Sequence, residues 1–436
     1  MSSARWTALA ILCCGSGGVL GAQPEPLGAE FQVNTYTTEA QERAAMDVGR
    51  DGRFVVVWRS YYSDIRARRF APDGTPLGED FRVNTLDSYD HDPAVAMAAT
   101  GDFVIAWGSY GSVGGTDPAY TIVARRFAAD GTPQGPEFQI NSFTTGEQNR
   151  PRVAYAPSGG FIAVWQSAET ADGDVDLGIV ARRFAADGTP LADDFQINSY
   201  TTSQQYDPSI GVADSGEFVV VWSSLGSDGD DDASTSIQGR RFAADGTALG
   251  EQFQVNTYTP DRQWEADLAV RPDGDFMVTW MSYGSAGDDP DVSVQARLFA
   301  ADGTPLGDDF QVNTYTPNEQ VFPAVGAAAP AQFVVTWSSY GSTGSDIHFR
   351  SAQARVFSPD GTATSDDFQV NTLTPGHQTP DAVAVGPNGD FVIVWTGSSP
   401  ADPSLGILGQ RFRSRLPVFA DGFESGDTSA WSDTVP

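Results

Sequence analysis

The sequence of 436 residues contains no lysine, and it has only 2 cysteines and 3 histidines. Without lysine there is neither a P-loop lysine nor a Schiff-base lysine, which excludes the chemistries that depend on them. So few cysteines and histidines do not support most zinc clusters. Basic residues number 25 against 57 acidic ones, so the net charge is −32 and no basic surface for nucleic acid is expected. The composition excludes several classes of function and identifies none.

Residues 1–22 have the pattern of a secretory signal peptide. Arg5 supplies the charged start, an apolar run follows, and small residues precede an expected cleavage before Gln23. Cys13 and Cys14 both lie in the apolar run, so the mature chain is expected to have no disulfide. An alternative lipoprotein reading of Cys13 is disfavoured by the bulky Leu12 before it. We expect a secreted, periplasmic or surface-exposed protein, monomeric and without a membrane span.

Three short signals repeat seven times along the chain. A Phe-x-[Val/Ile]-Asn-[Thr/Ser] segment begins at intervals of 50 and then 57 or 58 residues, at Phe31, Phe81, Phe138, Phe195, Phe253, Phe310 and Phe368. An apolar run ends in a tryptophan in every unit, at Trp58, Trp107, Trp165, Trp222, Trp280, Trp337 and Trp395. A third run ends in Phe, at Phe70, Phe127, Phe184, Phe242, Phe299, Phe357 and Phe412. Such self-similarity indicates a repeat architecture rather than a series of separate domains.

Each unit predicts four β-strands and no helix. In one unit these strands are 209–213, 218–222, 237–242 and 253–257, with Asp-Gly type turns after the first and third. Seven such units predict an all-β fold, a seven-bladed β-propeller of four-stranded blades over residues 23–412, because stacking in a ring buries both faces of every sheet. A linear solenoid is the alternative. The lone strand 31–35 at one end and a three-stranded unit at the other predict that the N-terminal strand completes the last blade.

The repeat resembles one found in exported bacterial proteins, in which no activity is assigned to it. The resemblance is carried by Phe-Val-Val-Val-Trp, then Ala-Arg-Arg-Phe-Ala-x-Asp-Gly-Thr-Pro-Leu-Gly, then Phe-Gln-Val-Asn-Thr, and it spans 31–412. Residues 413–436 form a tail whose Asp-Gly-Phe-Glu-Ser-Gly-Asp-Thr-Ser-Ala-Trp-Ser string is similar to a C-terminal motif of unrelated bacterial secreted proteins. Two interpretations of the tail stay open, a sorting signal and the remnant of a lost domain.

Side chains that repeat in every blade are first interpreted as scaffold. The third strands carry a repeated arginine and the stretch before the fourth a repeated acid, which predicts Arg–carboxylate pairing across that hairpin; these are Arg68, Arg125, Arg182, Arg240, Arg297 and Arg355, with Asp80, Glu137, Asp194, Asp309 and Asp367. A glutamine follows six of the seven motif asparagines by seven residues, as a backbone cap or as a ligand-facing ring near the axis; this weak candidate binding set is Gln41, Gln148, Gln205, Gln263, Gln320 and Gln378.

The connections between second and third strands differ from blade to blade and gather acids. They are a weak candidate set for Ca²⁺, which prefers about 6–8 oxygen ligands, although none matches an EF-hand loop; solvated acidic loops are the alternative, and the residues are Asp172, Asp174, Asp176, Asp228, Asp230, Asp288 and Asp289. His91, His348 and His377 are scattered over three units, and their spacing indicates no catalytic triad. No Gly-x-Ser-x-Gly elbow, His-Glu-x-x-His or dinucleotide fingerprint is present.

These observations favour an exported binding module without catalysis, because variable loops on a rigid repeated frame suit a binding surface. The expected partner is a glycan or a protein. The alternative is a carbohydrate-active hydrolase or lyase with its site at the mouth of the axial channel, an analogy from fold alone.

Overall fold

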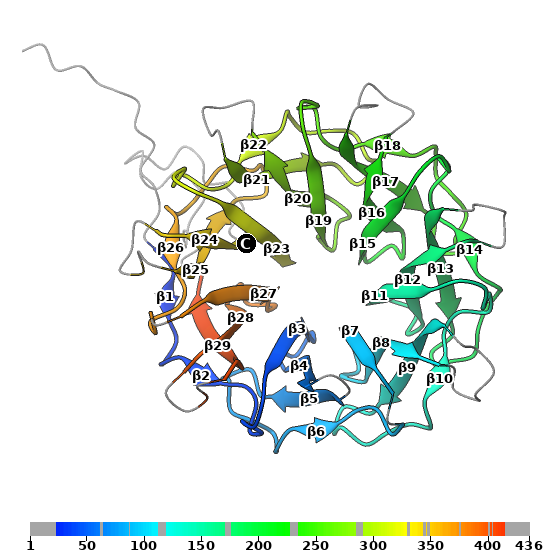
Figure 1. The fold of residues 1–436 in the computed structure, drawn as a ribbon, viewed down its shortest axis with the longest axis horizontal. Coiled ribbons are helices and arrows are strands. Elements are labelled where there is room, and N and C mark those ends of the chain that lie inside the picture. Colours follow the sequence, from blue (N-terminus) through cyan, green and yellow to red (C-terminus); the bar gives the residue numbers. More distant parts are fainter. Residues whose placement is uncertain are drawn as a thin grey trace, which may run out of the picture.

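The fold is all β, a ring of seven antiparallel sheets around a central channel, in a computed structural model of the chain (Figure 1). The structure describes residues 23–414 except 62–63, 87, 112–118, 171–175, 227–233, 285–290, 329–331, 343–345, 347–348, 375, 400–401 and 403. No helix capable of crossing a membrane occurs in this part of the chain. The predicted signal segment and nearly all of the tail lie outside the described residues.

Six blades are continuous in sequence and share one meander, in which the first strand lines the channel and the fourth lies on the rim. Blades 1 to 3 consist of β3 (Gln41–Val48), β4 (Phe54–Ser60), β5 (Asp64–Phe70) and β6 (Phe81–Arg82); β7 (Asp90–Met97), β8 (Phe103–Tyr110), β9 (Tyr120–Phe127) and β10 (Phe138–Gln139); and β11 (Gln148–Tyr155), β12 (Phe161–Ala168), β13 (Leu177–Phe184) and β14 (Phe195–Gln196). Blades 4 to 6 consist of β15 (Gln205–Val212), β16 (Phe218–Leu225), β17 (Thr235–Phe242) and β18 (Phe253–Gln254); β19 (Gln263–Val270), β20 (Phe276–Tyr283), β21 (Val292–Phe299) and β22 (Phe310–Gln311); and β23 (Gln320–Ala328), β24 (Gln332–Tyr340), β25 (Arg350–Phe357) and β26 (Phe368–Gln369).

Blade 7 joins the two ends of the described chain, as the sequence predicts. Its own strands are β27 (Gln378–Val385), β28 (Phe391–Gly397) and β29 (Gly406–Arg413). The N-terminal β2 (Phe31–Gln32) pairs with β29 through Phe31 opposite Gly409, and β1 (Glu25–Pro26) extends the same edge. The prediction that the N-terminal strand closes the ring is confirmed.

The outer strands are shorter than predicted because the motif asparagine replaces the backbone ladder. In blade 7 the Val33 amide donates to the Ile407 carbonyl oxygen (2.8 Å), and the next bond runs from the Ile407 amide to the Asn34 side-chain oxygen (2.8 Å). The equivalent asparagine accepts from a third-strand amide in each of the other six blades. The asparagine therefore ends the strand and starts the crossing to the next blade.

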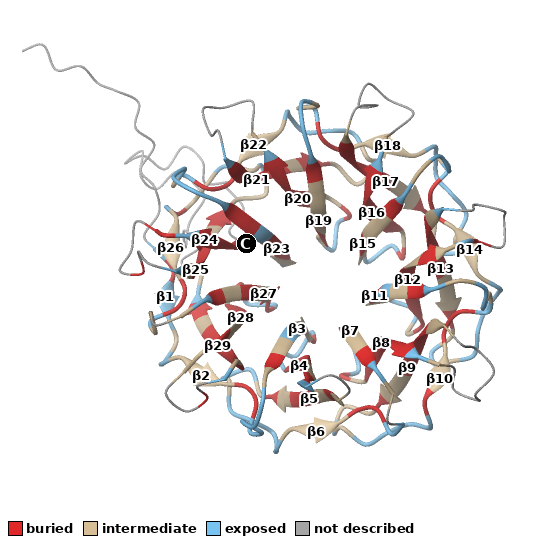
Figure 2. Cartoon of the chain, in the orientation of Figure 1, coloured by how far each residue is buried: buried red, intermediate tan, exposed pale blue. Residues whose placement is uncertain are grey.

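The core lies between neighbouring blades, in the second and third strands. The run of β16 is buried from Phe218 to Ser224, because its sheet is covered on both faces. The seven strand-end tryptophans are all at most 1 % exposed. Figure 2 shows the same distribution, with buried residues in the middle of each blade and exposed ones in the loops. This packing explains why one apolar pattern repeats in every unit.

The two ends of the ring carry different connections. The Asp-Gly type turns lie at one end, here called the turn face, where Asp73 accepts from the Thr75 amide and Gly74 has φ of 83°. The crossings and the starts of the second-to-third-strand connections lie at the other end, the entry face. The Ala168 amide at the end of β12 donates to the carbonyl oxygen of Glu147 in a crossing (2.8 Å), and five more blades repeat this contact. The second-to-third-strand connections therefore start on the same face as the crossings. The acids Asp174, Asp230 and Asp289 within these connections lie outside the described residues.

Candidate functional site

The central channel holds a cavity that is lined by the first strand of every blade (Figure 1). Its volume is about 1140 Å³. Repeated and non-repeated residues meet here, because each blade contributes one strand with its own side chains. The channel is therefore where blades of nearly identical frame present different chemistry.

A β-bulge interrupts the first strand of every blade near its entry-face end. In six blades the third residue of the strand takes a left-handed backbone conformation although it is not glycine; these residues are Arg43 (φ 57°), Asp92 (48°), Arg150 (53°), Asp207 (55°), Glu265 (52°) and Phe322 (57°). All six line the channel, and we call them the bulge ring. In blade 7 this position is Pro380, whose φ is fixed near −65°, and the register shift falls between Pro380 and Ala382.

Such a conformation costs roughly 1–3 kcal/mol for each non-glycine residue. A bulge leaves its extra residue outside the ladder and redirects the side chain. Here the redirected side chains line the cavity. We identify the candidate site by this unfavourable conformation, which occurs six times at one end of the channel. Five of the six side chains are charged.

Neighbouring members of the bulge ring pair with opposite charges. Arg43 forms an ion pair with Asp92, and Arg150 forms one with Asp207. Burial opposes the ionisation of Asp92, but the hydrogen bond from His91 and the charge of Arg43 outweigh it and hold the pKa of Asp92 well below its usual range. The result is an alternation of positive and negative groups around blades 1 to 4.

The carboxylates on the other side of the ring behave differently. Burial raises the pKa of Glu265, and the nearby charge of Asp207 raises it further. Burial also raises the pKa of Asp207, against the opposing charge of Arg150. Glu265 forms no ion pair with a described residue. Unlike Asp92 and Asp207, its carboxyl group is therefore not engaged by a ring arginine and can receive a donor from a ligand.

Three further carboxylates lie deeper in the channel wall and join blades together. Asp47 accepts from the Met97 amide (2.7 Å), and Asp381 accepts from the Thr396 hydroxyl (2.7 Å). Asp267 accepts from the Ser209 hydroxyl (2.9 Å) and also from the Val325 amide. These side chains are half-buried, and the channel wall around them excludes much of the bulk water. The resulting desolvation raises the pKa of Asp47 to about 6 and that of Asp381 to about 7.

An ion pair spans the channel at the turn face. It joins Arg50, in the turn of blade 1, to Asp214, in the turn of blade 4. Because blades 1 and 4 are not neighbours, the pair crosses the ring and obstructs this end of the cavity that both residues line. The bulge ring lies at the opposite end, on the entry face.

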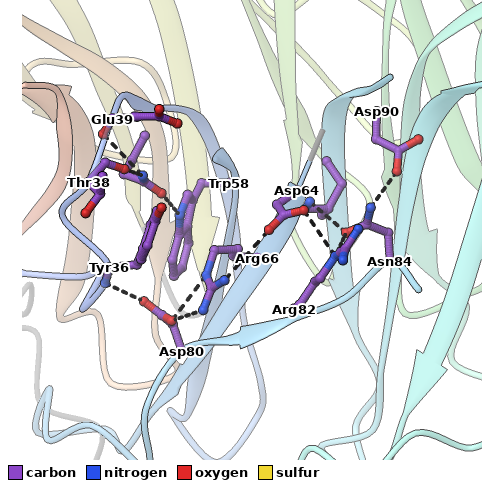
Figure 3. Close-up of polar contacts among 12 residues, drawn as sticks. Tyr36, Thr38, Glu39, Trp58, Asp64, Arg66, Asp80, Arg82, Asn84 and Asp90 are labelled. Atoms are coloured by element: carbon purple, nitrogen blue, oxygen red, sulfur yellow. Dashed lines mark hydrogen bonds and ion pairs between the residues drawn. The ribbon is translucent and has the colours of Figure 1, made fainter. Parts of the chain in front are cut away.

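The predicted glutamine set lies inside the blades. Gln41, Gln148, Gln205, Gln263, Gln320 and Gln378 are each at most 1 % exposed. In five blades the glutamine oxygen accepts from the indole N–H of the strand-end tryptophan, at 2.9 to 3.2 Å. The Gln41 amide donates to the carbonyl oxygens of Thr38 and Glu39, which lie beside Trp58 in Figure 3. These contacts are those of the backbone cap, while the channel is lined by the residues that follow the glutamines. Blade 2 has the buried Asp90 in place of the glutamine at the start of its first strand.

The repeated arginines act between blades more than across the hairpin. Arg240 donates to the Gly250 carbonyl oxygen in its own blade (3.1 Å) and to that of Ile197 in the preceding blade (2.9 Å). The predicted hairpin ion pairs are found in three of the five blades for which both partners were named, and they are long: Arg182 with Asp194 (3.6 Å), Arg297 with Asp309 (3.8 Å) and Arg355 with Asp367 (3.8 Å). Asp80 binds the Thr35 and Tyr36 amides of the preceding crossing and pairs with Arg66 (Figure 3). Arginines and acids together connect the blades.

Most of the predicted calcium-ligand set falls outside the described residues. This applies to Asp172, Asp174, Asp228, Asp230, Asp288 and Asp289, and only Asp176 is described. Within the described ranges no group of three or more metal-ligating side chains is found. His348 also lies outside, and His377 packs edge-on against Phe349. His91 is the histidine near the channel, and its Nδ1 lies 3.0 Å from the Asp92 carboxylate.

No protein-family model and no curated protein sequence matches the chain. Among solved structures, a polysaccharide lyase, Uly1, is similar at 9% identity with a TM-score of 0.53, covering 88% of this chain and 99% of its own. A protein of unknown function from Dyadobacter fermentans is similar at 14% identity with a TM-score of 0.51, and the match covers 76% of this chain and 97% of that protein. A copper-bound fungal alcohol oxidase of the AA5 family is similar at 11% identity with a TM-score of 0.51, and the match covers 90% of this chain and 76% of the oxidase. These likenesses show a shared propeller fold and nothing finer.

Proposed function

We propose that the protein is an exported, non-catalytic binding module whose ligand enters the channel from the entry face and is held by the bulge ring. The observation that carries the proposal is the set of six non-glycine residues in left-handed conformation at the mouth of the cavity. Such conformations persist only where the surrounding structure imposes them, and they concentrate at functional sites.

The chemistry of the ring supports binding. The frame around it repeats from blade to blade, whereas the bulge positions carry arginine, aspartate, glutamate or phenylalanine. Packing between blades would be served by one residue type at all of these positions. A set of different polar groups on a rigid frame instead provides oriented donors and acceptors for one ligand.

A second candidate, a carbohydrate-active hydrolase or lyase, is favoured by one observation. Asp207 and Glu265 lie on neighbouring blades, and burial raises the pKa of each. Glycoside hydrolysis uses one protonated and one ionised carboxyl group on either side of the bond to be broken. The fold is also shared with a polysaccharide lyase.

The test uses the chain from residue 23 to 436 in a glycan, protein and metal binding screen, with two matched variants. Glu265→Gln changes the bulge ring, while Glu251→Gln makes the same change at an exposed position on the rim. The proposal expects weaker binding only for Glu265→Gln, with no new reducing ends or unsaturated products from any bound glycan. Equal binding by both variants would refute the channel site, and product formation that is lost in Glu265→Gln would establish the enzyme instead.

A further inference from the structure

Blade 2 carries a cluster of four aromatic rings at the entry face. Tyr120 is its centre, with edge-on contacts to Tyr110 (5.3 Å between ring centroids), His91 (4.9 Å) and Tyr89 (6.3 Å). Tyr110 and Tyr120 lie directly opposite each other at the open ends of β8 and β9. Edge-to-face contacts favour a fixed mutual arrangement of the rings. The cluster is a pre-arranged aromatic surface, which we call the blade-2 platform.

Packing of the propeller does not require this platform. Tyr110 is 55 % exposed and Tyr89 is 42 % exposed, so much of their ring area faces solvent. Tyr283 in blade 5 occupies the position of Tyr110 and is similarly exposed, but its cross-strand partner is Val292 rather than a tyrosine. The grouping of rings is therefore a property of blade 2 and not of the repeat.

The platform is continuous with the bulge ring through His91 and Asp92. The His91 imidazole contacts Tyr120 on one side and bonds to the Asp92 carboxylate, which pairs with Arg43. The imidazole also lies over Gly108, where a Cβ atom would come within 2.7 Å of its Cε1 atom. The six equivalent positions carry side chains: Arg59, Gln166, Ser223, Met281, Ser338 and Thr396. The space at Gly108 lets the histidine join the two surfaces.

We infer that the ligand is a neutral oligosaccharide, with one sugar ring packed on the exposed Tyr110 ring of the blade-2 platform and the chain continuing into the bulge ring. This inference rests on the proposed binding function and names its ligand class. Sugar C–H groups carry partial positive charge and pack on the negative faces of aromatic rings. Sugar hydroxyl groups both donate and accept, which suits an alternation of carboxylates and guanidinium groups.

The charges of the protein argue against an ionic ligand. A polyanion would meet a protein of net charge −32. A simple cation would meet Asp92 and Asp207 already paired with Arg43 and Arg150. A neutral polyhydroxyl chain avoids both conflicts, because it bonds to paired groups without adding charge.

The experiment is isothermal titration calorimetry of the chain 23–436 with neutral hexasaccharides of glucose, xylose, mannose, arabinose and N-acetylglucosamine. Trigalacturonate and tetramethylammonium serve as charged probes. The variants are Tyr110→Ala, the matched Tyr283→Ala and the ring variant Glu265→Gln, each checked for an unchanged melting temperature. Truncation of a central aromatic contact is expected to weaken binding about tenfold. Tyr283→Ala is expected to bind as the wild type does.

The possible failures separate the platform from the channel site. If a neutral hexasaccharide binds and Tyr110→Ala matches Tyr283→Ala while Glu265→Gln is weaker, the platform is refuted and the channel site stands. If only trigalacturonate or tetramethylammonium binds, the neutral ligand class is refuted, and Glu265→Gln with that probe decides the channel site. If none of these probes binds, the oligosaccharide inference is refuted, and the wider screen decides the channel site.

Discussion

The indole nitrogen of Trp280 donates a 3.1 Å hydrogen bond to the side-chain oxygen of Gln263, and both side chains are fully buried. The same bond joins tryptophan and glutamine in four other blades. The glutamine amide then bonds to crossing carbonyls such as that of Pro260 (3.3 Å). One side chain thus connects the core of a blade to the crossing that brings the chain in from the preceding blade.

Gln263→Leu is expected to destabilise the protein, because it leaves a buried indole N–H and a crossing carbonyl without partners. An unsatisfied buried group costs about 1–3 kcal/mol. The change is measured as a lowered melting temperature against wild type. Combining it with Trp280→Phe should cost clearly less than the two single changes added together, since the pair acts as a unit. Simple additivity would mean that the bond contributes little.

Removing residues 23–36 is expected to open the ring. Without β1 and β2, the edge of β29 loses its backbone partners and becomes available for pairing with another chain. Lower melting temperature and self-association, measured by light scattering on a sizing column, are the expected results. Phe31→Ala should expose the N-terminal strand to proteolysis, whereas Phe253→Ala, at the same place in an uninterrupted blade, should not release a chain end. A deletion mutant that stays monomeric with wild-type melting would contradict ring closure.

Arginine is required at the repeated third-strand position, and lysine is not expected to replace it. Arg240 reaches carbonyl oxygens in two blades and lies over Phe242 (5.6 Å from its guanidinium carbon to the ring centroid). A lysine has a single ammonium group and cannot reproduce the planar fork. Arg240→Lys should lose about 1–2 kcal/mol of stability, on the scale of one or two hydrogen bonds, whereas the exposed Arg413→Lys should lose none. Equal melting temperatures for both variants would show that the guanidinium contacts of Arg240 are dispensable for stability.

The fold was predictable because its signals are local and repeated. The run from Phe218 to Trp222 and the motif asparagines mark strands in each unit, and seven copies determine the ring. The partners of Arg240 were not predictable, since they are backbone carbonyls of other residues, which carry no sequence signal. The pair of Arg50 and Asp214 joins positions 164 residues apart, and only the closed ring brings them together.

The bulge ring was missed for a different reason. A bulge shifts the alternation of side chains by one residue, but only two residues of each first strand precede it, which is too few for alternation to reveal the shift. One signal was present: the second residue after the six glutamines varies, being Arg43, Arg150, Asp207, Glu265, Phe322 or Pro380 inside an otherwise regular unit. A variable position within a repeated unit marks where the blades present different side chains to the channel. The sequence reasoning considered the glutamines themselves and the acidic loops instead.

The calcium prediction for the acidic connections can be tested by thermal unfolding. Close carboxylates such as Asp172, Asp174 and Asp176 repel one another, and a bound cation would relieve that repulsion. Binding to the folded state alone would stabilise it by about 2.7 kcal/mol at a hundredfold excess over Kd. Melting the mature chain in chelator, in Ca²⁺ and in matched Mg²⁺ measures this as a shift of about 2–4 °C or less. Three superimposable curves would leave the loops as solvated acids.

Stability is expected to rise as the pH is lowered from 8 to about 5. Desolvation in the channel wall raises the pKa of Asp381 to about 7 and that of Asp47 to about 6, whereas an unfolded aspartate ionises near 3.9. At a pH between the unfolded and the folded pKa, the unfolded chain has released protons that the folded chain still holds. The stabilising contribution of these two groups is therefore fully present below about pH 4 and declines as the pH rises toward 7. Asp92 and Asp80 have lowered pKa values, and their contribution is lost at still lower pH. A maximum near pH 4–5 follows from the two opposing sets.

The substitution that isolates this effect is Asp381→Asn, compared with Asp366→Asn at an exposed position on the rim. Asparagine carries no charge, so Asp381→Asn should melt higher than wild type at pH 8 and close to it at pH 5. Each pKa unit corresponds to about 1.4 kcal/mol, and channel water reduces the full effect, so a gain of a few degrees is expected at pH 8. Asp366→Asn should follow the wild-type curve throughout. If Asp381→Asn lowers the melting temperature equally at both pH values, the carboxylate is needed for its bond to Thr396 and the proposed pH dependence does not come from it.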